Sequence, residues 1–189
     1  MASVRAFIAV RLHGDAADAI AEYVRAMETI DSSVKWVEVC NLHLTLKFLG
    51  DTERSRIPAL QAAVGGALAG GRQFRVGFAG AGAFPNVSRP RVLWVGVRGG
   101  AEELSRIALA IDDSTIASGF PGADKAFRPH LTIGRARGES AGAAVSKALA
   151  CSAGASFGSM LVDSVHIVAS TLTPAGPIYT TLSELKLRA

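Results

Sequence analysis

Two short segments of the sequence carry the same pattern of histidine, leucine, threonine and an aliphatic residue. The first runs from His43 to Leu46 and the second from His130 to Ile133. In a β-strand, residues two apart point to the same face, so each histidine shares a face with the threonine of its own copy. The leucine between them faces the other way and can pack in a core. One copy alone carries little information, but two copies indicate a motif.

Two imidazoles and two hydroxyls suit the cleavage of a phosphodiester. One neutral ring can take a proton from attacking water while a protonated ring donates one to the departing oxygen. Histidine titrates at a pH of about 6.5 when unperturbed, so both forms are accessible near neutrality. The hydroxyls of Thr45 and Thr132 can donate to the phosphoryl oxygens as charge accumulates there. Arg135, five residues after His130, is either a charge-assisted phosphate contact or a solvated residue at a strand end.

Other kinds of catalytic site fit the sequence less well. A metal site usually needs three or more protein ligands, and the two motifs supply only two imidazoles. The sequence has no GxSxG elbow for a serine nucleophile, and we interpret Cys40, close to His43, as a buried thiol. No GxGxxG or GxxxxGK[ST] segment follows a predicted strand. We therefore expect neither a metal nor a cofactor.

Three further residues near the motifs have two possible roles each. Strand alternation places Lys47 on the same face as His43, although a solvated lysine is the simpler interpretation. Phe48 and Trp94 could stack on a terminal base of a nucleic acid, or they could pack in the core.

The composition limits the class of protein. Of the 189 residues, 49% are hydrophobic and 19% are charged, which is typical of a packed protein and not of a disordered one. The net charge of +4 mildly favours phosphate-bearing partners but is too small for a protein that coats long nucleic acids. Two cysteines are too few for a disulfide framework, and the apolar run near the N-terminus is too short for a signal peptide or membrane span. We expect a cytoplasmic protein without membrane contact.

Hydrophobic periodicity predicts helices and strands in mixed order. The predicted strands are 4–12, 34–39, 42–49, 73–80, 91–97, 130–137, 160–170 and 180–187, and the predicted helices are 15–30, 53–69, 101–118 and about 140–150. Because several strands follow one another directly, the order favours an α+β fold with a mainly antiparallel sheet. Two similar lobes, each contributing one motif strand to a common central groove, would explain why the motifs lie about half the chain apart. We expect residues 1–189 to form a single bilobal domain and the protein to be a monomer.

The segments HLTLKFLG and RPHLTIGR resemble the two HxTx signatures of the 2H phosphoesterase superfamily, and in particular the LigT-like RNA 2′,3′-cyclic phosphodiesterases, long called 2′-5′ RNA ligases. The segments RAFIAVRL and FPNVSRPRVLWVGV are also similar to parts of that family. The family usually has Pro-Glu-Asn before the first motif, where this chain has Val39, Cys40 and Asn41.

The resemblance implies a bilobal fold with flanking helices and a water-filled groove. It implies metal-independent hydrolysis of a 2′,3′-cyclic phosphate at an RNA 3′ end, or of a related cyclic nucleotide, to a 2′-phosphate. It assigns His43 as proton donor to the leaving 3′ oxygen, His130 as the base that activates water, and Thr45, Thr132 and Arg135 as substrate-binding residues. Three alternatives stay open: a reversible 2′-5′ RNA ligase, a phosphodiesterase of small cyclic nucleotides, and a non-catalytic module that binds RNA ends.

Overall fold

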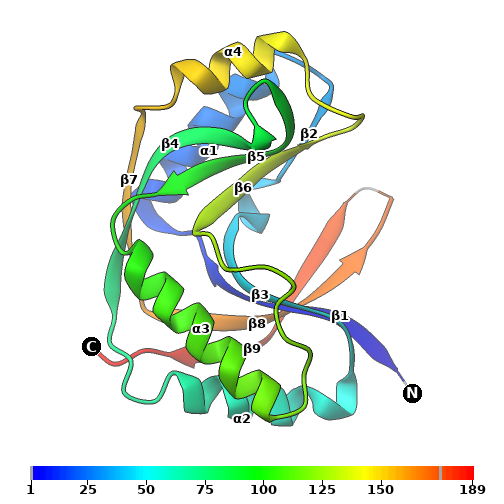
Figure 1. The fold of residues 1–189 in the computed structure, drawn as a ribbon, viewed down its shortest axis with the longest axis vertical. Coiled ribbons are helices and arrows are strands. Elements are labelled where there is room, and N and C mark those ends of the chain that lie inside the picture. The colour runs from blue at the N-terminus through cyan, green and yellow to red at the C-terminus, as the bar shows by residue number, and fades with distance from the viewer. Residues whose placement is uncertain (1, 175) are drawn as a thin grey trace.

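The structure, a computed structural model, describes residues 2–174 and 176–189, which form two antiparallel sheets with helices against each (Figure 1). The four-stranded sheet has the order β3-β1-β8-β9, with β3 at His43–Glu53, β1 at Ser3–Arg11, β8 at Ser164–Leu172 and β9 at Pro177–Lys186. The five-stranded sheet has the order β2-β6-β5-β4-β7, with β2 at Val34–Trp36, β6 at His130–Ala136, β5 at Arg89–Val97, β4 at Phe74–Asn86 and β7 at Ser156–Val162. The predicted α+β class with antiparallel sheets and flanking helices is confirmed.

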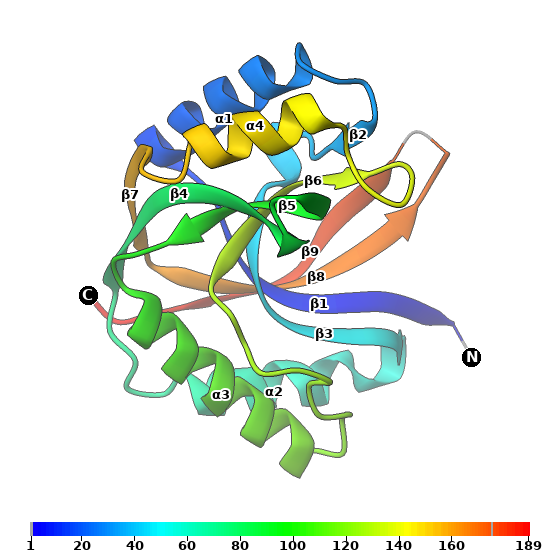
Figure 2. The ribbon, with the colours of Figure 1, turned by 45° about the horizontal axis from the view of Figure 1, so that its top comes forward.

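Each sheet carries its own pair of helices. Helices α1 (Gly14–Glu28) and α4 (Ala143–Cys151) contact β7 and β4 of the five-stranded sheet. Helices α2 (Ile57–Ala67) and α3 (Ala101–Ala117) pack on each other and on β9 and β3 of the four-stranded sheet. Short 3₁₀ turns, η1 (Val39–Asn41) and η2 (Arg54–Arg56), precede β3 and α2. Both sheets therefore lie between the two helix pairs (Figure 2).

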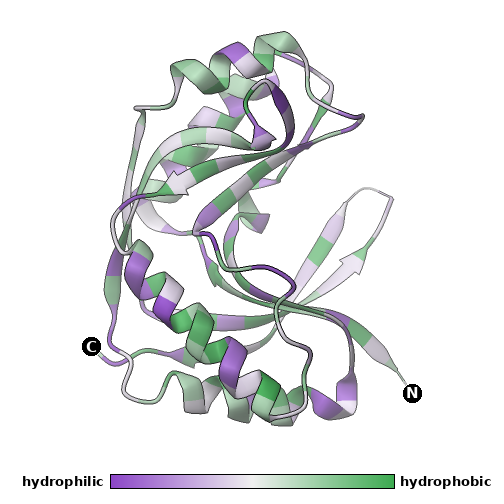
Figure 3. Cartoon of the chain, viewed as in Figure 1, coloured by the Kyte–Doolittle hydropathy of each residue, from purple (hydrophilic) through white to green (hydrophobic). Residues whose placement is uncertain are grey.

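The apolar stripes of the helices explain this arrangement. In α1 the buried residues recur at helical spacing, and α3 buries one face in the same way. The rest of the α3 surface is mixed, because Leu109 and Ile116 are exposed among its polar residues, and Figure 3 shows polar and apolar bands along this helix. On β1, Ala6, Ile8 and Val10 belong to the large core that the helices cover, whereas Phe7 and Ala9 belong to a small separate cluster on the other face. We call the face of each sheet that is turned away from its helices the inner face.

Several predicted boundaries differ from the structure. The predicted helix 53–69 begins only at Ile57, and the predicted strand 34–39 ends at Trp36. The predicted strand 160–170 is two strands in different sheets, because β7 ends at Val162 and β8 begins at Ser164. The chain changes sheet at Asp163, whose carboxylate accepts a 2.8 Å hydrogen bond from the Ser164 hydroxyl. The predicted loop around Pro85 and Pro90 is mostly strand, because β4 continues to Asn86 and β5 starts at Arg89.

The chain crosses repeatedly between the sheets, so each sheet contains strands from both halves of the sequence. The two lobes are therefore not successive segments, and the single domain over residues 1–189 stays a prediction. In the described residues, no helix has the length and apolar character needed to span a bilayer.

Candidate active site

The two motifs lie at the starts of two strands that contact each other. His43 is the first residue of β3 and His130 the first of β6, and these strands are in contact although they belong to different sheets. Thr45 pairs with Ala9 of the small inner-face cluster, which places His43 and Thr45 on the inner face of the four-stranded sheet. Leu131 is fully buried among the helix-covered core, so its neighbours on β6 point to the opposite, inner face.

Both histidine rings are held in the same way. Nδ1 of His43 lies 2.6 Å from the carbonyl oxygen of Asn41, and Nδ1 of His130 lies 2.6 Å from the carbonyl oxygen of Arg128. A carbonyl oxygen can only accept a hydrogen bond, so Nδ1 carries the proton in both rings. In each ring Nε2 is then the nitrogen left to exchange a proton with a substrate.

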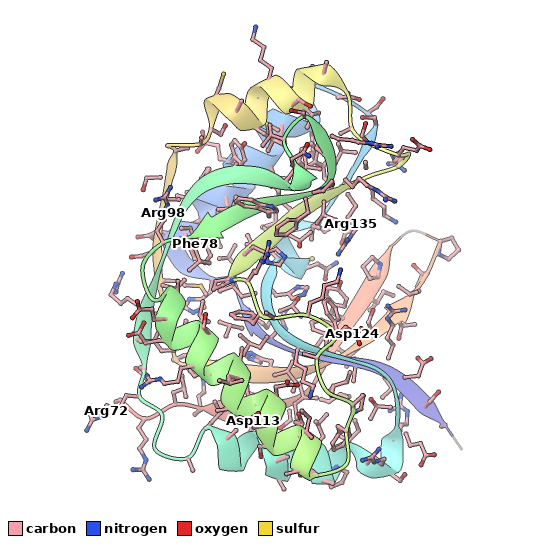
Figure 4. All side chains as sticks on the ribbon, in the orientation of Figure 1. Arg72, Phe78, Arg98, Asp113, Asp124 and Arg135 are labelled. Carbon is pink, nitrogen blue, oxygen red and sulfur yellow. The ribbon has the colours of Figure 1, made fainter. Side chains whose placement is uncertain are left out.

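A β-bulge in β6 decides where Arg135 points. Ile133 is an extra residue, because its neighbours Thr132 and Gly134 pair with successive residues of β5. An extra residue reverses the alternation of every residue after it. Arg135 therefore shares the inner face with His130 and Thr132, whereas regular alternation would have turned it away. Figure 4 shows Arg135 on the side of β6 that faces the β8–β9 hairpin.

The corresponding bulge in β3 has the opposite effect on Lys47. Leu46 is the extra residue, because Thr45 and Lys47 pair with successive residues of β1. The predicted position of Lys47 beside His43 is therefore wrong: its side chain points to the helices and is 2% exposed. Its Nζ lies 2.6 Å from a carboxylate oxygen of Asp112 and donates to the Thr115 hydroxyl at 2.7 Å. The same oxygen of Asp112 accepts from the backbone nitrogen of Ala123 at 3.0 Å, in the segment that leads to His130.

Aromatic rings surround His43. The Phe7 ring lies 4.8 Å from the His43 ring between centroids, and the Tyr179 ring meets the His43 ring edge-on at 5.3 Å. Phe48, returned to the inner face by the bulge, lies 6.1 Å from Phe7 and is 64% exposed. This ring is therefore available to a ligand.

His130 has aromatic neighbours of its own. The Phe84 ring meets the His130 ring edge-on at 5.1 Å. Trp94 packs on Phe84 at 5.6 Å and covers Gly82, where a Cβ atom would come within 2.5 Å of the indole ring. Trp94 is half-buried in this packing.

Burial lowers the pKa of His43 below its usual value, because the desolvated ring resists protonation. The hydrogen bond to the Asn41 carbonyl opposes this effect, and the positive charge of Arg11 adds to it. Burial also raises the pKa of the Tyr179 hydroxyl, against the lowering effect of the charges on Arg135 and Arg5. The guanidinium of Arg135 on the five-stranded sheet is thus close enough to act on Tyr179 of the other sheet.

This geometry brings all five predicted residues to the inner faces of two strands in contact. The family model described as the 2′-5′ RNA ligase superfamily matches residues 14–173, which is most of the chain. The chain belongs to this superfamily. The resemblance expected from the motifs is therefore confirmed.

Curated relatives of the superfamily match over nearly the whole chain. An RNA 2′,3′-cyclic phosphodiesterase of Methanothermobacter thermautotrophicus is 35% identical over 97% of this chain and 99% of its own. A protein of the same name from Aeropyrum pernix is 40% identical over 81% of this chain and 86% of its own.

Solved structures of superfamily members agree with the fold. A protein of Thermus thermophilus is 30% identical and superposes with a TM-score of 0.82 over 98% of each chain. E. coli LigT, solved in complex with 3′-AMP, superposes with a TM-score of 0.80 over the full length of both chains, at 24% identity. The LigT likeness concerns the fold alone.

Sequence reasoning missed several residues around the superfamily motifs. Phe7, Arg11 and Tyr179 come to the site from β1 and β9, and only the strand register reveals them. The predicted burial of Cys40 is wrong: its side chain is exposed on η1, with Sγ 3.8 Å from a carboxylate oxygen of Glu38. Within residues 2–174 and 176–189, no group of three or more His, Cys, Asp or Glu residues could hold a metal ion.

Proposed function

We propose that this protein hydrolyses the 2′,3′-cyclic phosphate at RNA 3′ ends and leaves a 2′-phosphate. The observation that carries the proposal is the pair of histidines with bonded Nδ1 and available Nε2, each with a threonine on its own face, on two strands in contact. The names of the curated relatives support the same reaction.

The reaction is a displacement at phosphorus. Nε2 of His130 takes a proton from water, the water oxygen bonds to phosphorus, and the bond from phosphorus to the 3′ oxygen breaks. Nε2 of His43 gives its proton to that oxygen, which leaves as a hydroxyl. The hydroxyls of Thr45 and Thr132 and the guanidinium of Arg135 hold the non-bridging oxygens, where negative charge builds up. The phosphate lies between the inner faces in this scheme.

The donor role of His43 depends on the substrate. Because burial lowers the pKa of His43, the free protein favours the neutral ring. A phosphodiester anion beside the ring stabilises its protonated form and raises the pKa again. Binding of the substrate thus favours protonation of His43, which later gives this proton to the 3′ oxygen.

Phe48 is our candidate for the contact with the terminal base. The exposed Phe48 ring lies on the inner face next to Phe7, and Phe7 in turn lies next to His43. In a bound nucleotide the ribose would lie over Phe7, between a phosphate at His43 and a base at Phe48. Stacking of a base on an aromatic side chain is worth about 1–3 kcal/mol and tolerates any base.

The direct test is product analysis with an RNA oligonucleotide that ends in a 2′,3′-cyclic phosphate. We expect the product to gain the mass of one water and to carry its phosphate on the 2′ oxygen, as read by phosphorus NMR. EDTA should leave the rate unchanged. A 3′-phosphate product would contradict the assignment of the leaving oxygen, and tight binding without product would indicate a non-catalytic module.

The description of the matching superfamily favours a second candidate, 2′-5′ joining of RNA ends. Adding an oligonucleotide with a 5′-hydroxyl to the same assay should reveal a 2′-5′-linked product if the displacement runs in reverse. A comparison with a cyclic mononucleotide measures any preference for small substrates. We expect the protein to act as a cytoplasmic monomer, and sedimentation of the purified chain tests the monomeric state.

A further inference from the structure

Lys35 and Arg135 form a pair of like charges on the inner face of the five-stranded sheet. Lys35 of β2 is the direct cross-strand partner of Arg135 of β6, and both side chains are exposed. Directly opposite residues in an antiparallel pair have Cβ atoms about 4.5–5.5 Å apart, and like charges in such a pair destabilise it. A negative charge beside the two side chains would relieve this repulsion.

The described part of the chain supplies none. In residues 2–174 and 176–189, no carboxylate lies within 4.0 Å of either cationic group, and neither side chain donates a hydrogen bond. Three arginines on these sheets are engaged by contrast: Arg11 donates to Thr181, Arg75 to Ser159 and Arg89 to Glu139. Lys35 and Arg135 present two free cations side by side.

The fold holds Lys35 firmly at this place. A Cβ atom on Gly134 would come within 2.8 Å of Val34 and 3.0 Å of Trp36, so these neighbours of Lys35 pack directly on the β6 backbone. The Val37 nitrogen also donates to the Ile133 carbonyl at 3.0 Å. The ammonium thus extends from a fixed backbone, one strand farther from the histidine motif than Arg135.

We propose that Lys35 binds the phosphodiester that precedes the cyclic phosphate in an RNA chain. The inference rests on the proposed function, in which Arg135 holds the reacting phosphate. Lys35 then meets the next phosphate along the chain, and the enzyme favours oligonucleotide ends over cyclic mononucleotides. A second anion beside Arg135 also removes the repulsion within the cationic pair.

The experiment measures kcat/KM for three substrates: a 2′,3′-cyclic mononucleotide, a dinucleotide with the same cyclic end, and that dinucleotide with a neutral methylphosphonate linkage. The variants are Lys35→Gln and, as a matched control, Lys147→Gln on the exposed side of α4. We expect Lys35→Gln to lose roughly threefold to tenfold on the charged dinucleotide, the effect of one exposed charge contact, and nothing on the other two substrates. The slope of log kcat/KM against log salt for the charged dinucleotide should become shallower by about 0.7.

An equal loss on all three substrates would overturn the inference, because Lys35 would then act on the fold or on the reacting phosphate. An unchanged preference for the charged dinucleotide in Lys35→Gln would overturn it as well, while leaving the proposed function standing. A wild-type protein that hydrolyses none of the three substrates would overturn both.

Discussion

On β3 and on β6, the motif histidine is positioned by the same local geometry. Its Nδ1 lies 2.6 Å from the carbonyl oxygen two residues earlier, and one extra residue follows its threonine. After the bulge the two copies differ. The first continues with Lys47, which is buried against α3, and the exposed Phe48, whereas the second continues with Gly134 and Arg135.

The shared residues and the divergent residues of the two copies have different roles. The shared part fixes the tautomer and direction of an imidazole, which proton transfer requires of both rings. The divergent part gives one copy an exposed aromatic ring and the other a guanidinium at the equivalent inner-face position. In the proposed function, this asymmetry orients the substrate, with its base toward Phe48 and its phosphate toward Arg135.

The largest expected effect comes from the shared part. His43→Ala and His130→Ala should each lower kcat by about 10²–10⁴-fold on a cyclic-phosphate RNA, because each removes one proton transfer. His13→Ala is the matched control, since His13 lies before α1, outside both motifs, with its Nε2 3.0 Å from the Leu161 carbonyl oxygen. Undiminished turnover in either motif variant, with circular dichroism unchanged, would reject the two-ring mechanism.

The second prediction concerns the buried lysine that distinguishes the first copy. Asp112→Ala removes the carboxylate beside the buried Lys47 ammonium while the contact with the Thr115 hydroxyl stays, and it should lower the free energy of unfolding by about 3–5 kcal/mol. Adding Lys47→Met should restore most of this loss, because the uncompensated charge is then gone. Urea denaturation of the single and double variants measures both effects. Equal stability of the single and the double variant would contradict a buried ion pair between β3 and α3.

The third prediction tests the guanidinium of the second copy. Arg135→Ala should lower kcat/KM by roughly 10–100-fold, since a hydrogen bond to a charged group contributes about 1.5–3 kcal/mol. Arg135→Lys keeps the charge but loses the two-pronged geometry, so it should recover only part of the activity. Full activity in Arg135→Ala would mean that Arg135 is a solvated residue at the end of its strand.

The sequence predicted the motif strands well up to their threonines, because the alternation of side chains is a local property. Leu44 and Leu131 are buried as expected, at 1% and 0% exposure. Beyond that point the prediction failed for Lys47, because the extra residue in β3 is set by pairing with β1. Arg135 reaches the inner face for the same non-local reason, whereas regular alternation would have placed it on the other face.

Two of the aromatic rings around His43 could not be predicted from the sequence. Phe7 and Tyr179 are far from His43 in the chain and carry no motif, so only the strand order β3-β1-β8-β9 brings them together. The same holds for the role proposed for Lys35, which depends on its register with Arg135.

The smallest expected effect concerns the pKa of His43, whose ring is more buried than the ring of His130. A profile of kcat/KM against pH reports the free enzyme and should be bell-shaped, because one ring must be neutral and the other protonated. Burial and the charge of Arg11 lower the pKa of His43, so the limb that belongs to His43 should lie below a pH of about 6.5. If His43 is the donor, activity falls as pH rises through this limb, since the ring must carry a proton.

Arg11→Gln removes a positive neighbour, makes protonation of His43 easier and should therefore move the His43 limb to higher pH. Arg11→Lys is the control, because it keeps the charge and should leave the limb in place while disturbing the contacts of Arg11 with Thr181 and Cys40. A shift in both variants would attribute the effect to those contacts. A limb that ascends with pH and moves only in Arg11→Gln would make His43 the base, and the proton-transfer roles of β3 and β6 would then be exchanged.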